Sequence, residues 1–373
     1  MRVRILSDEA VSPNLARGDA ATACAFVQMT RSADGDILCL YRRGSAKHGP
    51  DGALMVQRST DGGRTWEAPL TVFNRADREP PETVISGGIC AVGEELLVTL
   101  GTVEMLDPAA YIFSDQASAF PRHIRVLRSG DRGRTWSEPV SIETPSFAAR
   151  TGVASSPFLL GDGDLCVPLE VQLQEGPQCT SACISSDGGR TFTRPELLVG
   201  DKSGKLSLCD ARFARLGDGS YLMHLWTFRY DTEETLSPHE SRSADGRKWS
   251  EPRPTSITGQ ISQPLELPSG LLITVCNHRQ TPLGNQLWWS RDRGRTWNER
   301  PIQMWDATEG RMFGEPARPR TVTEEEDVWQ ALPRFSFGTP NLLCLDDGTI
   351  LLTYWATFQS VTHIRACRFR FDE

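Results

Sequence analysis

The chain has 373 residues, of which 39% are hydrophobic and 24% charged, so it holds enough apolar material for a large core. Its formal net charge of −8 disfavours a surface that binds nucleic acid, although a local cationic pocket is compatible with it. The sequence has no apolar run long enough to span a membrane, and its N-terminus lacks the apolar stretch of a secretory signal.

A short turn motif recurs five times and decides the fold class. It reads S-x-D-x-G-x-T-W and occupies residues 59–66, 129–136, 185–192, 243–249 and 290–297, with the fourth copy shortened. The Asp side chain can accept hydrogen bonds from backbone N–H groups ahead of it, the Gly permits a positive φ, and the aromatic residue supplies a packing face. We interpret this Asp box as a turn that repeats for stacking and not as a ligand or metal site.

A second pattern lies between the boxes, namely an Asp-Gly or similar turn between two apolar runs, which is a strong hairpin signal. Together the two patterns predict six units, each with strands A to D. The units lie near residues 20–75, 84–143, 152–200, 207–256, 260–303 and 337–371. Six such units around one axis form an all-β, six-bladed β-propeller of four-stranded antiparallel blades. The last unit lacks a box and a fourth strand, which we expect the segment from Arg2 to Leu6 to supply.

We expect residues 1–373 to form a single domain, because one closed repeat architecture can absorb the whole chain. Two insertions interrupt the repeat. Residues 103–122 lengthen the B–C loop of the second unit, and residues 304–336 separate the fifth unit from the sixth. Loops of this length are usually functional or disordered, and we interpret the acidic run at 324–327 as a solvated face.

Ten cysteines are scattered along the chain, mostly inside apolar strand-like runs where Cys behaves as a small hydrophobic residue. Cys179 and Cys183 come nearest to a metal-binding pair, but alone they do not predict a metal site, and we expect neither a metal nor a cofactor. Reduced thiols and the missing signal favour a cytoplasmic protein, with a secreted protein whose signal was removed as the alternative.

The strand order fixes the end of the propeller at which a site can form. Boxes join strands C and D and hairpin turns join A and B, so both face one end. A site therefore needs polar residues after B strands or before A strands, at the other end. Arginines and carboxylates that converge there suit an anionic or polyhydroxylated ligand. The residues in these positions are Arg42, Arg43, Lys47, His48, Asp51, Glu82, Glu104, Arg122, Arg150, Glu170, Asp210, Arg229, Tyr230, Asn277, His278, Arg279, Arg334 and Trp355.

The Asp boxes, the six-unit rhythm and the Asp-Gly hairpins together resemble the sialidase (neuraminidase) superfamily over essentially the whole chain. This resemblance implies an arginine triad that holds a substrate carboxylate. It also implies an acid/base Asp in the first B–C loop and a Tyr nucleophile paired with a Glu.

The family's site residues carry over in part. In the segment that follows Arg42, His48 falls nearest to the position of the family's acid/base Asp, and Asp51 is the available carboxylate. Asp210 resembles the family's Glu, and Arg229 and Arg279 are similar to two arginines of the triad.

Two elements of the family pattern are absent. Where the family has an R-I-P arginine, this chain reads Thr-Ala-Cys-Ala at 22–25. Where the family has its Tyr, the chain reads Gly-Thr-Pro-Asn at 338–341.

The first hypothesis is therefore a sialidase-like glycoside hydrolase that acts on sialic acid or a related acidic sugar, with water attack and inversion. Asp51 or His48 would protonate the leaving oxygen, and Asp210 would act as base or stabiliser. The partner would be a carbohydrate, with no nucleic acid and no membrane. The predicted substrate-binding residues are Arg42, Arg43, Glu170, Arg229, Tyr230, Arg279 and Arg334.

Two alternatives stay open at the level of sequence. A non-catalytic glycan-binding propeller would show aromatic platforms such as Trp226 and Trp355 without a carboxylate pair. A lyase acting on a uronic acid would use His48 or Tyr230 as its base.

Overall fold

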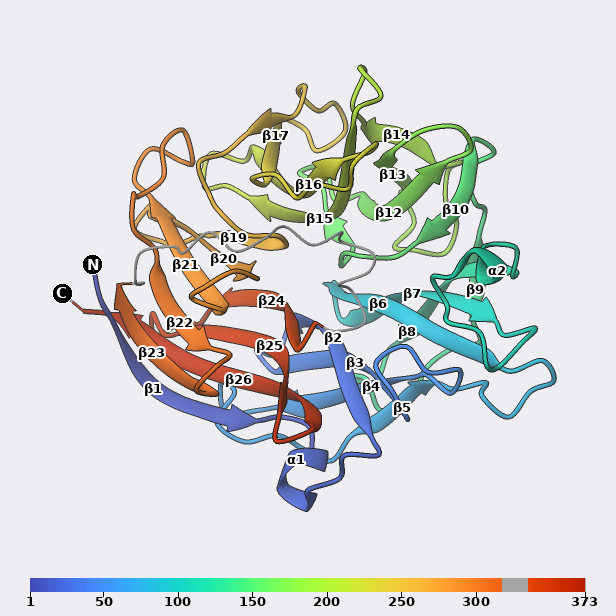
Figure 1. Ribbon diagram of the computed structural model, residues 1–373, viewed down its shortest axis with the longest axis horizontal. Coiled ribbons are helices and arrows are strands. Elements are labelled where there is room, and N and C mark those ends of the chain that lie inside the picture. Colours follow the sequence, from blue (N-terminus) through green and yellow to red (C-terminus); the bar gives the residue numbers. More distant parts are fainter. Residues whose placement is uncertain (317–334, 373) are drawn as a thin grey trace.

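The computed structural model describes residues 1–316 and 335–372. Six antiparallel sheets surround a central axis (Figure 1), which confirms the predicted all-β, six-bladed propeller. Helix in this part of the chain is confined to α1 (Asn14–Arg17) and α2 (Asp115–Ser118). At four residues each, these are far too short to cross a membrane, and no described helix is long and apolar enough to do so.

Blades 1 to 3 follow one another in chain order. Blade 1 comprises β2 (Ala23–Arg31), β3 (Ile37–Gly44), β4 (Ala53–Ser59) and β5 (Leu70–Phe73). Blade 2 comprises β6 (Glu82–Val92), β7 (Glu95–Glu104), β8 (Arg122–Ser129) and β9 (Val140–Ile142). Blade 3 comprises β10 (Ala148–Gly152), β12 (Leu165–Leu173), β13 (Gln178–Ser185) and β14 (Glu196–Val199), with the short β11 (Phe158–Leu159) also paired to β12.

Blades 4 to 6 complete the ring. Blade 4 comprises β15 (Leu206–Arg215), β16 (Tyr221–Arg229), β17 (His239–Ser243) and β18 (Arg253–Pro254). Blade 5 comprises β19 (Ser262–Glu266), β20 (Leu272–His278), β21 (Gly284–Ser290), β22 (Ile302–Asp306) and β23 (Arg311–Pro316). Blade 6 comprises β24 (Phe337–Cys344), β25 (Ile350–Phe358), β26 (Val361–Phe371) and β1 (Val3–Ala10).

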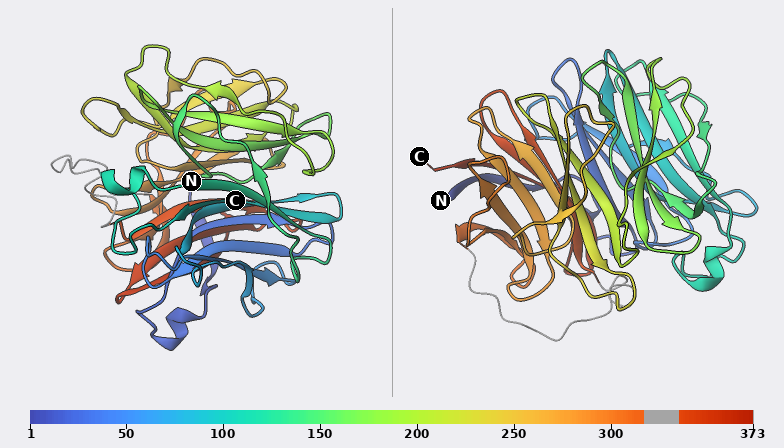
Figure 2. Two further views of the ribbon diagram at one scale, coloured as in Figure 1. Left: turned by 90° about the vertical axis from the view of Figure 1, so that its right-hand side faces the viewer. Right: turned by 90° about the horizontal axis from the view of Figure 1, so that it is seen from above.

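The N-terminal strand closes the ring, as the sequence predicts. β1 pairs antiparallel with β26, from Val3 opposite Phe371 to Ala10 opposite Arg365, and is longer than the expected segment. The two ends of the chain consequently lie side by side (Figures 1 and 2).

Both predicted insertions contain regular structure. In the first, α2 and its surroundings enclose a small apolar cluster made of Val103, Met105, Ile112, Ala117 and Phe120. The second begins with the end of β22 and with β23, which pairs with β22 and so protects the outer edge of blade 5. The predicted acidic run at 324–327 and Arg334 lie outside the described residues.

The apolar core lies between neighbouring blades rather than at one centre. One cluster joins blades 1 and 2 through Leu40, Leu54 and Val98, and another joins blades 2 and 3 through Ile124 and Leu165. Because each blade is covered on both faces, its strands are apolar on both sides, which explains the continuous apolar runs in the sequence.

The Asp boxes use their polar groups within the turn itself. Asp131 Oδ1 accepts hydrogen bonds from the N–H groups of Arg134 at 3.0 Å and Thr135 at 2.9 Å, and its Oδ2 accepts from the Thr135 hydroxyl at 2.6 Å. The hydroxyl and the N–H of Thr135 lower the pKa of Asp131 to about 2. Trp136 packs on the cluster between blades 1 and 2. These contacts support the interpretation of the box as a packing turn.

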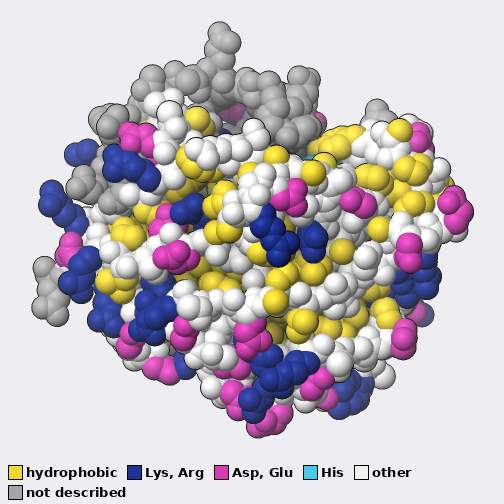
Figure 3. Space-filling view, turned by 90° about the horizontal axis from the view of Figure 1, so that it is seen from below, with side chains coloured by type: hydrophobic (Ala, Val, Ile, Leu, Met, Phe, Trp, Pro, Cys, Tyr) yellow, Lys and Arg dark blue, Asp and Glu magenta, His cyan; other side chains and the backbone are white. Residues whose placement is uncertain are grey.

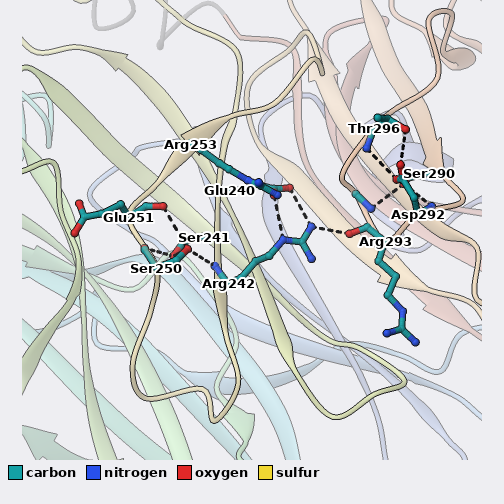
Figure 4. A network of polar contacts seen from close by, with 11 residues as sticks. Glu240, Ser241, Arg242, Ser250, Glu251, Arg253, Ser290, Asp292, Arg293 and Thr296 are labelled. Carbon is teal, nitrogen blue, oxygen red and sulfur yellow. Dashed lines mark hydrogen bonds and ion pairs between the residues drawn. The ribbon is translucent and has the colours of Figure 1, made fainter.

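A polar network ties blade 4 to the Asp box of blade 5 (Figure 4). Arg242 donates from Nη2 to Arg293 O at 2.6 Å and from Nε to Glu240 Oε1 at 3.1 Å. Arg253 donates from Nε to the same Glu240 oxygen at 2.8 Å. Two arginines therefore compensate the charge of Glu240, which is only 2% exposed.

Charged side chains of both signs share the outer surface. On the face seen from below in Figure 1, basic and acidic side chains lie interspersed (Figure 3).

Candidate active site

Three inner strands carry the same irregularity at the same height. The pairing register slips between Ala25 and Gln28 in β2, between Cys209 and Arg212 in β15, and between Gly338 and Asn341 in β24. The residue after the first of each pair has a positive φ, namely 58° at Phe26, 46° at Asp210 and 45° at Thr339. Such a conformation costs a non-glycine residue of the order of 1–3 kcal/mol. A bulge of this kind re-aims side chains.

These three bulged residues line one cavity on the propeller axis. The cavity has a volume of about 190 Å³ and takes lining residues from all six blades. Its polar residues lie on or just after B strands, as Glu170 on β12 and Arg279 after β20 do, or on A strands, as Arg150 on β10 and Asp210 on β15 do. It therefore lies at the end of the propeller opposite the Asp boxes, where strand polarity allows a site.

Glu170 and Asp210 form an acidic pair in the cavity wall. Glu170 lies on β12, and its Oε2 accepts a hydrogen bond from the Asp210 N–H at 2.9 Å. Arg212 Nη2 lies 3.7 Å from Asp210 Oδ1. Burial, and then the neighbouring Asp210 carboxylate, raise the pKa of Glu170 to about 7. Burial also raises the pKa of Asp210, against the opposing charge of Arg212. The pair is therefore arranged to hold a proton near neutral pH.

Three arginines from three blades bring positive charge to the same cavity. Arg212 donates from Nη1 to Ala154 O at 2.6 Å, and Arg122 donates from Nη2 to Ile112 O at 2.9 Å. Arg279 donates from Nε to Gln260 Oε1 at 3.0 Å. Burial lowers the pKa of Arg279 to about 9, which leaves it charged at neutral pH.

Several donors of the lining residues have no acceptor within the described part of the chain. They are Arg122 Nε, Arg212 Nε, Arg279 Nη1, Trp226 Nε1 and Trp355 Nε1. Buried donors are normally satisfied, because an unpaired one costs about 1–3 kcal/mol. The residues that line the cavity thus carry several donors that the described part of the protein leaves unsatisfied.

His48 and Lys47 enter the cavity from the B–C loop of blade 1. The His48 ring stacks on Phe26 at 5.3 Å and meets Phe113 edge-on at 5.1 Å. Burial, and then the charges of Lys47 and Arg42, lower the pKa of His48 to about 2, so its imidazole is neutral at neutral pH. Lys47 Nζ donates to Phe335 O at 3.0 Å, and burial lowers its pKa to about 7.

Arg42 and Asp51 brace this loop and do not line the cavity. Arg42 is completely buried and donates from Nε to Val84 O and from Nη1 to Ala46 O, both at 2.7 Å. Asp51 Oδ2 accepts from the Ser45 N–H and Asp51 Oδ1 from the Ser45 hydroxyl, both at 2.8 Å. Their polar groups are thus occupied in holding the loop that carries His48.

Three further residues of the predicted set, Arg43, Arg229 and Tyr230, do not line the cavity. Arg43 is exposed outside the cavity lining. Arg229 is exposed and pairs through Nε with Glu234 Oε2 at 2.8 Å. Tyr230 lines a neighbouring groove, and Arg334 is outside the described residues. The structure thus brings together His48, Glu170, Asp210 and Arg279 of the predicted set.

Arg212 was missing from the sequence-based candidates. It lies within β15, where alternation assigns side chains to the inter-blade core, and only the bulge at Asp210 turns it toward the axis. Its signal in the sequence is an Asp-Ala-Arg triplet inside an otherwise apolar strand.

All ten cysteines are free thiols, and nine of them are buried. Within residues 1–316 and 335–372, no group of three or more His, Cys, Asp and Glu side chains has the arrangement of a metal site.

The fold and the cavity define an Asp-box propeller with an axial site lined by arginines and a carboxylate pair. The family model of the BNR repeat-like domain matches residues 110–352, and the chain belongs to this family. No curated protein matches the sequence.

Several solved structures share the fold. A protein of unknown function from Dyadobacter fermentans has a TM-score of 0.72 at 17% identity, over 99% of both chains. The Hadza microbial sialidase Hz136 has a TM-score of 0.68 at 18% identity, over 93% of this chain and 65% of the sialidase. The α-L-arabinanase of Penicillium chrysogenum has a TM-score of 0.67 at 15% identity, over 98% of both chains. At these identities the likeness shows the fold, and the chain is a divergent member of it.

Proposed function

We propose that this protein is a glycoside hydrolase that acts on a glycan bearing an acidic sugar. The observation that carries the proposal is the Glu170–Asp210 pair, set in a cavity whose arginines have unpaired donors. A carboxyl pair can run glycoside hydrolysis, and arginines select an anionic substituent. The fold shared with a sialidase and an arabinanase supports the proposal as an analogy.

Glu170 is the best-placed general acid. Its raised pKa of about 7 keeps a large fraction protonated at neutral pH, as a group that protonates the leaving oxygen must be. The predicted acids fit less well, because Asp51 lies outside the cavity and His48 is neutral. Asp210, held beside Arg212, would carry the negative charge that stabilises an oxocarbenium-like transition state.

The absence of a suitable Tyr favours direct attack by water. All five tyrosines of the chain fall within the described residues, and none of them lines the cavity. A covalent intermediate on Tyr therefore has no residue to form on. We infer a single displacement in which Asp210 takes a proton from the attacking water while Glu170 protonates the leaving oxygen, with inversion at the anomeric carbon.

The carboxylate pair argues against the alternative of a non-catalytic glycan-binding propeller. Trp226 and Trp355 do line the cavity, as that alternative requires, but Glu170 and Asp210 line it as well. Of the two bases predicted for a lyase, only His48 lines the cavity, because Tyr230 lies in a neighbouring groove.

A hydrolysis screen tests the proposal. Aryl α-glycosides of N-acetylneuraminic acid, related nonulosonic acids, Kdo and neutral sugars would be incubated with the protein and with Glu170→Gln. Release from an acidic glycoside that the variant slows by about 10²–10⁴-fold is expected. Nuclear magnetic resonance of the first-formed anomer reports inversion. An unsaturated product detected by ultraviolet absorbance would point to a lyase, and silence across the panel would count against an enzyme.

A further inference from the structure

A second hollow adjoins the axial cavity between blades 3 and 4. It has a volume of about 420 Å³. Arg150, Gln172 and Gln178 line both the cavity and this hollow, so these three side chains form the boundary between the two. We call this hollow the lateral groove.

The size of the axial cavity makes the lateral groove relevant to binding. Small-molecule sites typically enclose about 300–1,000 Å³. The axial cavity, at about 190 Å³, falls below that range, whereas the groove adds about 420 Å³ beside it. A ligand that fills the cavity would therefore extend into the groove.

The groove offers the contacts that sugars use. Gln172 and Gln174 present amide groups, which can both donate and accept hydrogen bonds. Tyr230 is 45% exposed and supplies an aromatic face with a hydroxyl at its edge. A neutral, hydroxylated ring with one apolar face matches this combination.

Tyr230 is held by a tight turn and not by a loose loop. Its N–H donates to Lys205 O at 2.7 Å. The next residues fold back, with the Glu233 N–H donating to Arg229 O at 2.9 Å and Arg229 Nε paired with Glu234 Oε2 at 2.8 Å. On the facing blade, Gln174 is fixed by a hydrogen bond from its Nε2 to Ser146 O at 3.2 Å. Binding to such a preorganised surface loses little conformational entropy.

We propose that the lateral groove binds the sugar units that follow the one in the axial cavity, so that the protein prefers an oligosaccharide to an isolated glycoside. Arg150 sits at the junction and holds an oxygen-rich group there, since its guanidinium forms no hydrogen bond or ion pair with another described residue. This inference rests on the proposed function, because it takes the ligand of the axial cavity to be a sugar.

The test compares long and short ligands by titration calorimetry on the full chain carrying Glu170→Gln, which suppresses turnover. Two probe pairs would be used: 3′-sialyllactose against methyl α-N-acetylneuraminide, and trigalacturonic acid against galacturonic acid. For at least one pair we expect the longer probe to bind about tenfold more tightly. Adding Tyr230→Ala should remove most of that gain, whereas Tyr230→Phe, which keeps the ring, should retain it.

Leu197→Ala serves as the matched control, because Leu197 is an exposed residue on β14 of blade 3 away from the groove. Equal binding of long and short probes, no binding of any probe, or a gain that survives Tyr230→Ala would each overturn the inference. Hydrolysis by the unmodified protein is measured separately. If the longer probe binds more tightly in a Tyr230-dependent way but no hydrolysis is found, the inference about the lateral groove would hold and the proposed function would be wrong.

Discussion

Arg132, in the Asp box of blade 2, places its Nε 2.9 Å from the Asp34 carboxylate in the A–B turn of blade 1. The same joint recurs between later neighbours, as Arg190 with Glu95, Arg247 with Asp162, and Arg293 with Asp218. The A–B turn of blade 5, at 268–270, has no acidic residue, and the blade that follows it has no box. The box and the hairpin turn, which look like separate repeats in the sequence, are the two halves of one contact between blades.

Each of these ion pairs between neighbouring blades should contribute little to the stability of the protein by itself. Arg132 and Asp34 are 53% and 41% exposed, so solvent screens the pair. A double-mutant cycle with Arg132→Ala and Asp34→Ala, measured by urea unfolding, should give a coupling of about 0.2–1 kcal/mol. The coupling should shrink in 1 M salt, where screening is strong. A coupling that salt leaves unchanged would contradict this picture.

Loss of the Glu170 proton should abolish most activity without unfolding the protein. Glu170→Gln keeps the size and the hydrogen-bond acceptor for the Asp210 N–H, but it cannot protonate a leaving oxygen. We expect kcat to fall by about 10²–10⁴-fold, with an unchanged melting temperature or a small rise. Glu196→Gln, at an exposed carboxylate on β14, is the matched control and should behave as the unmodified protein. Full activity in Glu170→Gln would exclude Glu170 as the acid.

The same carboxyl predicts how stability depends on pH. The pKa of Glu170 is about 7 in the folded protein against an ordinary value of 4.5. The folded state therefore binds more protons between these values, and its stability falls as pH rises through this window. His48, with its pKa lowered to about 2, acts in the opposite sense, losing stability as pH falls below about 6.5.

The difference in free energy of unfolding between the unmodified protein and Glu170→Gln isolates the contribution of the Glu170 carboxyl. From pH 5 to 7.5, the free energy of unfolding of the unmodified protein should fall relative to the variant, by an amount of the order of 1 kcal/mol. Denaturant titrations at the two pH values measure it. A relative rise would show that Glu170 is ionised and stabilised in the folded state.

Arg279 should decide between acidic and neutral ligands. Its guanidinium stacks 3.8 Å from the Phe335 ring centroid and 4.3 Å from that of Phe337, and a lysine cannot reproduce this planar contact. Arg279→Lys should raise KM for an acidic glycoside about 10–100-fold and affect a neutral one less. Arg291→Lys, at an exposed Asp-box position, is the control. Equal losses for acidic and neutral glycosides would argue against a carboxylate contact.

Two adjacent arginines should differ sharply in their effect on stability. Arg42→Met leaves several buried carbonyl oxygens without a donor and should cost about 3 kcal/mol or more. Arg43→Met, on the exposed face of the same strand, should stay within about 0.5 kcal/mol. Denaturant unfolding of both variants measures the contrast, and similar losses would contradict the bracing role of Arg42.

The fold was predictable because its signals are periodic and local. The box and the hairpin turn each recur once in most blades, and the missing strand of the last blade pointed to β1. The strand added by residues 311–316 was not predicted, because six residues without a box or hairpin turn carry no periodic signal.

The sequence predicted the end of the propeller at which the site lies and some of the residues that line it. Strand polarity pointed to the end where His48, Glu170, Asp210 and Arg279 meet. It did not reveal Arg212, because a register slip of one residue leaves no mark in an alternating pattern. The sequence suggested Asp51 or His48 as the acid, whereas we propose Glu170, because the sequence does not encode the direction in which a side chain points.

The pairing of β1 with β26 has a consequence for biogenesis. Val3 precedes blades 1 to 5 in the chain and Phe371 follows them, yet the two residues face each other in one sheet. Blades 1 to 5 can form before β26 is synthesised, whereas blade 6 must wait for β26, and the edge of β1 stays unpaired until then. Because β1 and β26 are paired, a circular permutation is feasible, with a short linker joining the present ends and new ends placed in an exposed turn. The blade built from both ends of the chain would then be a different one. Comparing the folding yields of the two forms would measure the effect of closing the ring in this way.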